Sequence, residues 1–464
     1  MKIYLLLCLL AAGETGAAAP LTRDAAAGAL KRSATFFREQ VARHGGYVNY
    51  CSTDLKHRYG EGLATPDQIW VQPPGTPSVG LSYLRAYRAT GDRYYLEAAR
   101  ETASALIHGQ LKSGGWTAWI DFDPAGTRVA DYLRGGGRGR NYSSLDDGQT
   151  QTATRFLAEL DQALEFKDEE VHRAVEIALD SLLAAQFPNG AFPQVWSQPV
   201  EKQPVTAAKF PHYDWRSEGR IKNYWDMYTL NDDLAVDVAH LLIRAAQIYG
   251  SPRYEQALRR LGDFLLLAQL PDPQPAWAQQ YNYEMLPIWA RKFEPPAISG
   301  HESQGVIRTL IDISDFTGEK KYLEPIPEAL AFLKRAVLPD GRLPRFIELE
   351  TSRPLYMRRN GNVYTLTYDD SDLPKHYAFK ISHRLDELEQ EFRRAEAGTG
   401  PDLQGRKLSS LEKAARRSIE ELDDRGRWLS PNPGKLQEFG ELVIRSEVFS
   451  DHVEALCEFL EATR

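Results

Sequence analysis

Gly250-Ser251-Pro252-Arg253-Tyr254 is the stretch that decides the fold, because it separates two helix-like segments and its spacing recurs along the chain. Its glycine is followed four residues later by a tyrosine, as Gly91 is by Tyr95 and Gly318 by Tyr322. A glycine between two apolar-periodic segments is typical of the end of one helix just before the start of the next. The repeat therefore predicts a series of helical hairpins.

Apolar residues at helical spacing flank each of these turns and set the extent of the expected helices. The first helix of each hairpin is expected over Ser78–Ala89, Thr150–Leu164, Leu234–Ile248 and Ser303–Phe316, and the second over Tyr94–Gln110, Glu169–Gln186, Arg253–Gln269 and Tyr322–Val337. Further helices are expected over Ala25–Arg43, Leu408–Leu422 and Val448–Glu461.

Helical hairpins stacked side by side predict an all-α fold, an α/α toroid that is an incomplete or closed barrel of helical hairpins with long loops. Strand-like alternation is scarce, so we expect at most a small β-hairpin around Asn360 and Gly361. The length of 464 residues suits one large domain over residues 20–464.

Composition limits the partners of the chain. It is 42% hydrophobic and 26% charged, with a net charge of -8. No general basic surface is available for nucleic acid or anionic lipid, and no later apolar run is long enough to span a membrane. We therefore expect a monomer that binds neither nucleic acid nor membrane.

The first 19 residues have the charged start, short apolar core and small-residue end of a secretory signal peptide. Cleavage near Ala19 predicts a secreted or periplasmic protein. Cys8 would leave with the signal, so Cys51 and Cys457 would remain. An exported pair forms either a disulfide or two buried free thiols, and the sequence leaves both open.

Acidic residues stand directly before the first helices of successive hairpins. Asp146 and Asp147 precede the second, Asn231, Asp232 and Asp233 the third, and His301 and Glu302 the fourth. Equivalent helix ends share one rim of a toroid, where carboxylate oxygens suit Ca²⁺. The competing interpretation is helix capping, which needs only one acid at each start.

Arginine and aromatic residues form a second group. The loop Pro287–Ser303 contains Arg291 and cannot be a regular helix because of Pro295 and Pro296. Four more arginines follow the fourth hairpin, at positions Arg345, Arg353, Arg358 and Arg359. Arginine forks suit bidentate capture of carboxylates, although such a run can also be a solvated face paired with acids.

Five motifs in this order resemble those of the family 10 polysaccharide lyases, pectate lyases of helical toroid fold. The motifs are Asp146-Asp147-Gly148-Gln149-Thr150 running into Arg155-Phe156-Leu157, Pro188-Asn189-Gly190-Ala191-Phe192-Pro193-Gln194, Asn231-Asp232-Asp233, Trp289-Ala290-Arg291 with Phe293-Glu294-Pro295-Pro296 and Ser299-Gly300-His301-Glu302-Ser303, and Arg345-Phe346 with Arg353-Pro354 and Arg359. The family has Asn at the position of Asp147 and Ser at that of His301.

The resemblance implies Ca²⁺-assisted β-elimination on polygalacturonate or a related uronan. Arg291 would be the base that removes the C5 proton. The Ca²⁺ ligands would come from Asp146, Asp147, Asp232 and Asp233. Arg345, Arg353, Arg359, Asn231 and Glu302 would bind the acidic polysaccharide.

Two alternatives remain at this point. A toroid glycoside hydrolase acting on unsaturated uronides would use two of the carboxyl groups of Asp146, Asp147, Asp232, Asp233 and Glu302 as acid and base. A non-catalytic uronan-binding protein would keep the arginines and aromatics without a working base.

Overall fold

The computed structural model describes residues 20–134, 137–400, 407–434 and 436–464, and the expected signal over residues 1–19 lies outside them. Twelve α-helices occupy the described ranges. Even-numbered helices pack one against the next and form what we call the inner row. In spatial order these are α12 (Ser446–Ala462), α2 (Thr76–Thr90), α4 (Gln149–Ala163), α6 (Leu234–Tyr249), α8 (Gly300–Thr317) and α10 (Leu385–Glu396).

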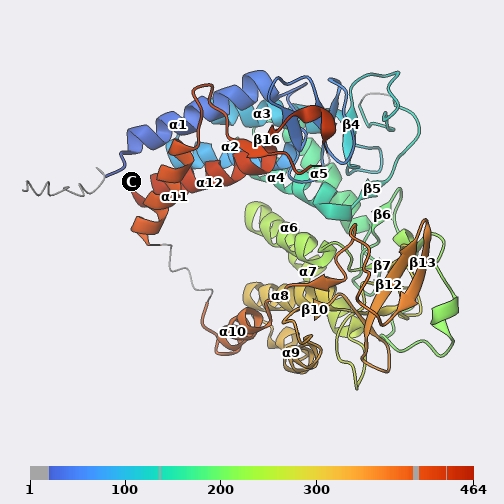
Figure 1. The fold of residues 1–464 in the computed structure, drawn as a ribbon. Coiled ribbons are helices and arrows are strands. Elements are labelled where there is room, and N and C mark those ends of the chain that lie inside the picture. Colours follow the sequence, from blue (N-terminus) through green and yellow to red (C-terminus); the bar gives the residue numbers. More distant parts are fainter. Residues whose placement is uncertain (1–19, 135–136, 401–406, 435) are drawn as a thin grey trace, which may run out of the picture.

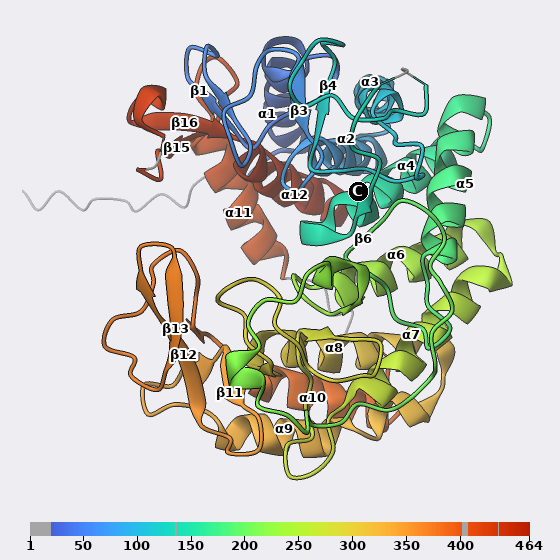
Figure 2. The ribbon, with the colours of Figure 1, turned by 90° about the vertical axis from the view of Figure 1, so that its right-hand side faces the viewer.

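The odd-numbered helices form an outer row against the inner one. They are α1 (Arg23–Phe36), α3 (Arg93–His108), α5 (Glu169–Ala184), α7 (Pro252–Ala268), α9 (Ile326–Arg335) and α11 (Leu408–Glu420). The two rows curve into an α/α toroid that stays open, because α10 lies apart from α11 and α12 in both views (Figures 1 and 2). The predicted fold class is confirmed in its incomplete form.

The predicted helices of the repeat are found, with one error of extent and one omission. The segment expected as a helix from Tyr322 begins with a 3₁₀ turn, η5 (Lys320–Leu323), and α9 starts only at Ile326. Pro325 and Pro327 explain the break, because proline favours the first turn of a helix and not its interior. Helix α10 was not predicted, and it buries only four residues in a highly charged sequence.

Short antiparallel strand pairs join the loop before each inner helix to the loop before the next. They are β3 (Gln68–Trp70) with β4 (Trp119–Asp121), β5 (Ser143–Ser144) with β6 (Val195–Trp196), β7 (Tyr228–Thr229) with β8 (Gln280–Tyr281), and β9 (Ala297–Ser299) with β11 (Phe346–Glu348). The N-terminal ends of α2, α4, α6 and α8 therefore share one rim, as the repeat predicted.

The expected β-hairpin is present as β12 (Pro354–Asn360) and β13 (Val363–Thr367), but it is part of a larger sheet of order β13-β12-β11-β9. A second four-stranded sheet joins β15 (Leu429–Pro431), β16 (Leu442–Arg445), β1 (Tyr50–Ser52) and β2 (Arg58–Tyr59), and β10 (Leu343–Pro344) pairs with β14 (Lys380–Ile381). The expectation of one hairpin was wrong here, because strands of two or three residues leave no alternating pattern. Short helical turns complete the fold: η1 (Phe37–Val41), η2 (Asp146–Gly148), η3 (Trp215–Ser217), η4 (Tyr224–Asp226) and η6 (Gln437–Phe439).

A repeated glutamine, which we call the glutamine clamp, ties each rim loop to the next outer helix. The Nε2 of Gln110 donates to the carbonyls of Gly114 and Ala174, at 2.7 and 2.9 Å. The Nε2 of Gln186 donates to the carbonyls of Gly190 and Ala257, at 3.0 and 2.9 Å. The Nε2 of Gln269 donates to the carbonyls of Pro275 and Pro325, both at 3.1 Å. Each amide thus donates to one carbonyl of its own rim loop and to one carbonyl in, or directly before, the next outer helix, and so ties the two together.

A repeated hydroxyl in the first turn of an inner helix fastens the same loops from the other side. The Oγ1 of Thr150 accepts from the backbone N–H of Trp116 (3.1 Å) and donates to its carbonyl (3.2 Å). Ser303 does the same with Trp277, at 3.1 and 3.2 Å. The indoles of Trp116 and Trp277 in turn donate to carbonyls near the ends of α3 and α7, each at 2.8 Å.

Cys51 and Cys457 are both buried free thiols, so the second of the two alternatives for this pair holds. None of the helices in the described ranges has the length and apolarity needed to cross a membrane.

Gln186→Met removes the polar groups of one clamp with little change in side-chain shape, and it also deprives Arg260 of an acceptor at 2.9 Å. We expect the free energy of unfolding to fall by about 2 to 3 kcal/mol, because the buried carbonyl of Gly190 loses its donor and Arg260 loses its acceptor. Denaturant unfolding measures this. Gln390→Met on the exposed face of α10 is the control, and an equal effect of both substitutions would contradict the role of the clamp.

Candidate active site

The acids of the rim sit in an unusual backbone conformation. Asp147, Asp232 and Asp233 have φ values of 45°, 55° and 55°, in the left-handed region. Such backbone is costly for residues other than glycine and gathers at functional sites. This backbone points the side chains of neighbouring aspartates before α4 and α6 in different directions, so that consecutive carboxylates have different partners.

Asp146, Asp147 and Asp232 form the acid cluster of the site. The Nε2 of Gln194 donates to Asp146 Oδ1 (2.5 Å) and that of Gln72 to Asp147 Oδ2 (2.9 Å). Burial raises the pKa of Asp232 to about 9, opposed by Arg291 and reinforced by Asp146, Asp147 and a hydrogen bond with Asp146. Burial and Asp146 likewise raise the pKa of Asp147 to about 6.

Asp233 faces another way, since its Oδ2 lies 3.6 Å from His301 Nε2. Hydrogen bonding to His301 lowers the pKa of Asp233, and the same bond raises that of His301. Among the described residues, no group of three or more His, Cys, Asp or Glu side chains is arranged to hold a metal ion. The four aspartates expected at one cation are thus divided, and Asp146 and Asp232 are the pair in direct contact.

Arg291 stands beside this cluster and is held by Glu294. Its Nε and Nη2 lie 2.8 and 2.7 Å from Glu294 Oε1, and its backbone N–H donates to Oε2 at 2.9 Å. Its Nη2 is also 3.6 Å from Asp232 Oδ2. Burial lowers the pKa of Arg291, but Glu294 and Asp232 outweigh it, so the net shift is upward.

Tyr377 connects Arg291 to Arg345. Its hydroxyl donates to Glu294 Oε1 (3.0 Å), and its ring centre lies 5.8 Å from the Arg291 guanidinium and 4.5 Å from that of Arg345. Arg345 is nearly buried and pairs with Glu302 at 3.5 Å, while its Nε has no hydrogen-bond partner among the residues that the structure describes. The two arginines therefore border one aromatic ring.

The other residues predicted to bind substrate are less closely grouped. Arg359 lies on β12 with its guanidinium 5.7 Å from the ring of Tyr364, which contacts Phe293 at 5.3 Å. Arg353 instead stacks on Tyr368 at 3.5 Å. Asn231 donates to Asp232, and its buried Oδ1 has no partner.

Sequence reasoning missed three residues of this site. Gln194 ends one of the motifs quoted above, so its place in that loop was a usable signal. Gln72 and Tyr377 lie outside every motif, and only the packing of the loops brings them to the acids and arginines.

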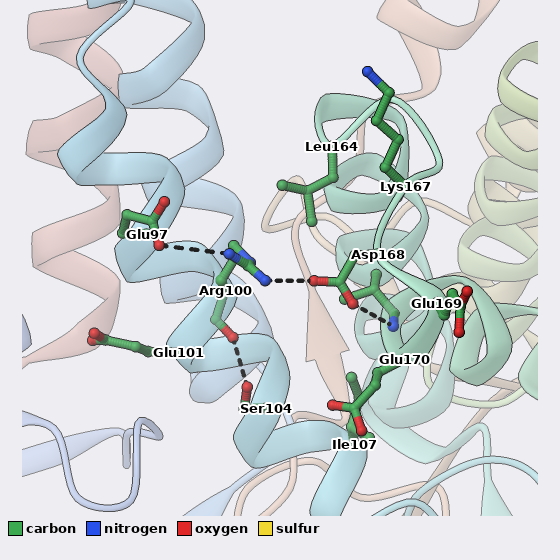
Figure 3. A pocket seen from close by; sticks show the side chains of 11 residues that line it. Glu97, Arg100, Glu101, Ser104, Ile107, Leu164, Lys167, Asp168, Glu169 and Glu170 are labelled. Carbon is green, nitrogen blue, oxygen red and sulfur yellow. Dashed lines mark hydrogen bonds and ion pairs between the residues drawn. The ribbon is translucent and has the colours of Figure 1, made fainter.

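A different cavity, of about 570 Å³, lies between α3 and α5 of the outer row (Figure 3). Its charges pair with one another, since Arg100 lies 2.9 Å from Asp168 and 3.8 Å from Glu97. It contains none of the predicted site residues.

Residues 120–343 match the model of a family described as pectic acid lyase. The resemblance to the pectate lyases is confirmed. The segment that matches the pectate lyase model includes the acid cluster and Arg291, whereas Arg345, Arg359 and Tyr377 lie beyond it. The match supports an enzyme that acts on polysaccharides.

Several solved structures are similar to the chain. A mutant family 10 polysaccharide lyase from Cellvibrio cellulosa, in complex with trigalacturonic acid, is 19% identical over 69% of this chain and 98% of that one, with a TM-score of 0.47. Cellobiose 2-epimerase from Spirochaeta thermophila is 16% identical over 95% of this chain and 97% of that one, with a TM-score of 0.50, a likeness of fold. A search of curated proteins finds no match.

Asp232→Asn tests the strain in the acid cluster. With a folded pKa of about 9, Asp232 holds a proton that the unfolded chain releases near pH 4, so stability falls as pH rises between these values. We expect the variant to be more stable than the parent by about 1 to 2 kcal/mol at pH 8, with the difference vanishing near pH 4. Thermal unfolding across this pH range measures the effect, and a destabilised variant at pH 8 would contradict it.

Proposed function

We propose that this protein is a lyase that cleaves polygalacturonate or a related uronan by β-elimination, with Arg291 as the base. The carrying observation is the position of Arg291 between Glu294 and Asp232, beside a second arginine, in a segment that matches the pectic acid lyase model. We further propose a secreted or periplasmic monomer, with residues 1–19 as its signal and one domain over residues 20–464.

The chemistry requires positive charge around a substrate carboxylate. Removal of the C5 proton places further negative charge next to a group that is already anionic, and preorganised cations lower this barrier. The proton passes to Arg291, the C4–C5 double bond forms, the C4–O bond breaks, and the departing oxygen takes a proton from solvent. Arg345 supports this proposal because one of its donors is unsatisfied, and Arg359 adds a second fork.

Arg291 needs a change in its surroundings before it can accept a proton. In the resting protein its acidic neighbours favour the charged guanidinium, and free arginine is always protonated. The negative charge of Glu294 must therefore be compensated when substrate is bound, and Asp232 must keep its proton or be neutralised by a cation. The positive charge of Arg345 acts in the same direction.

The donor set fits Ca²⁺ held in part by the protein. Asp146 and Asp232 are close enough to hydrogen-bond, and the buried Oδ1 of Asn231 is an acceptor without a partner. These are hard oxygen ligands of the type that Ca²⁺ prefers. Bound Ca²⁺ would neutralise the aspartates and the carboxylate of the substrate.

A glycoside hydrolase is supported less well by this geometry. Retaining glycosidases hold their two carboxyl groups about 5 Å apart, and inverting ones further apart still. Asp146 and Asp232 interact directly, so this pair does not have the separation of either class.

The first test is incubation with polygalacturonate, with Ca²⁺ and then with a chelator, at mildly alkaline pH. We expect ultraviolet absorbance from the new conjugated double bond, at a rate that falls at least ten-fold in chelator, since the metal supplies several kcal/mol of charge stabilisation. Reducing sugar without this absorbance would favour a hydrolase, and no product from pectate, alginate or glucuronan would refute the lyase.

Arg291→Ala should lower kcat by about 1,000-fold, within the range of general-base catalysis, while oligogalacturonate binding measured by calorimetry persists. Arg358→Ala is the matched control, because Arg358 forms an exposed ion pair with Asp369 at 2.9 Å. A fully active Arg291 variant would place the base elsewhere.

A further inference from the structure

A cavity of about 710 Å³ adjoins the site and shares Asp233, His301 and Arg345 with it. It lies between α6, α8, α10 and the segment before α10, which follow one another along the lower arm of the toroid in Figure 1. Asp233, Asp237, His240, His301, Arg345 and Arg384 are among its lining residues. Its volume is within the range of about 300 to 1,000 Å³ of ligand pockets.

Arg345 links this cavity to the proposed catalytic residues. It lines the cavity, is only 9% exposed, and has an Nε without a partner. The same guanidinium borders Tyr377, whose hydroxyl bonds to the carboxylate that holds Arg291. Arg345 therefore borders both the cavity and the residues around Arg291.

The lining combines acceptors and donors instead of one sign of charge. Asp233, the N-cap residue of α6, and Asp237 in the first turn of that helix both line the cavity, and the Asp237 carboxylate has no hydrogen-bond partner among the described residues. Arg345 supplies positive charge at the same end, and His301 adds an imidazole beside it. At the exposed edge of the cavity, His240 pairs with Asp312 at 3.2 Å, and Asp312 pairs with Arg308 at 3.1 Å.

This combination matches one chemical class, a sugar acid with one carboxylate and several hydroxyl groups. The Arg345 guanidinium suits the carboxylate, and the Asp237 carboxylate can accept from vicinal hydroxyls. His301 is one of the positions at which the chain departs from the pectate lyase pattern, so the part of the cavity lining that His301 forms is a feature of this protein.

We propose that this cavity is an additional subsite that binds a further uronate unit of the polymer, with Asp237 and His240 as specificity residues. The inference rests on the proposed lyase function and extends it from the bond that is cleaved to the length of chain that is recognised. Asp237 and His240 act on binding alone and take no part in the elimination.

The test compares trigalacturonate with hexagalacturonate. In Asp237→Asn, which keeps the side-chain shape, and in His240→Ala, we expect the ratio of kcat/KM on the longer to the shorter substrate to fall about ten-fold, as for loss of a hydrogen bond to a charged group. Arg100→Ala in the outer cavity of Figure 3 is the control and should leave the ratio unchanged. An unchanged ratio in both cavity variants, or an equal loss on both substrates, would overturn the proposal.

A binding measurement separates this proposal from the lyase reaction. Calorimetry with hexagalacturonate on the Arg291→Ala background, with and without Asp237→Asn, should show about ten-fold weaker binding in the double variant. If the parent protein cleaves no uronan but this difference persists, the lyase fails and the subsite stands. If binding is unaffected, the subsite fails whatever the activity.

Discussion

The clamps at the ends of the outer helices are the constraint on which the rim depends. A loop that leaves an outer helix has unpaired carbonyls, and in a buried rim water cannot satisfy them. Gln110, Gln186 and Gln269 each satisfy one such carbonyl and at the same time bond to the next outer helix or the residue before it. Long loops between helices are thereby fixed closely enough to carry a site.

The site gathers acidic side chains that do not contribute to the stability of the fold. Asp146 and Asp232 are close enough to share a proton, and Asp147 and Asp232 sit on strained backbone. Strain and like-charge repulsion of this kind cost stability and gather where a ligand is to be bound. On the other side, Glu294 and Tyr377 hold Arg291 and Arg345 around one ring. A substrate carboxylate with a cation would meet opposite charges on both sides.

Much of this site could be predicted from the sequence, because the repeat places equivalent helix ends on one rim. Asp146 and Asp232 meet as expected, and Arg291 adjoins them. Two residues, Asp233 and Arg353, have neighbours other than those expected from the sequence. Asp233 turns to His301, since left-handed backbone at two successive residues separates neighbouring carboxylates. Arg353 stacks on Tyr368 because the hairpin places it there.

By itself, the sequence determined the helical hairpins, their order and the motifs of the pectate lyases, because apolar period, turn glycines and local motifs are short-range properties. Only the tertiary structure decided that the toroid is open, that Cys51 and Cys457 stay apart as thiols, and that Tyr377 joins the two arginines. These depend on contacts between residues far apart in the chain. The cavity beside Arg345 also depends on the tertiary structure, because three helices and a loop must pack together before its acidic and basic side chains line one cavity.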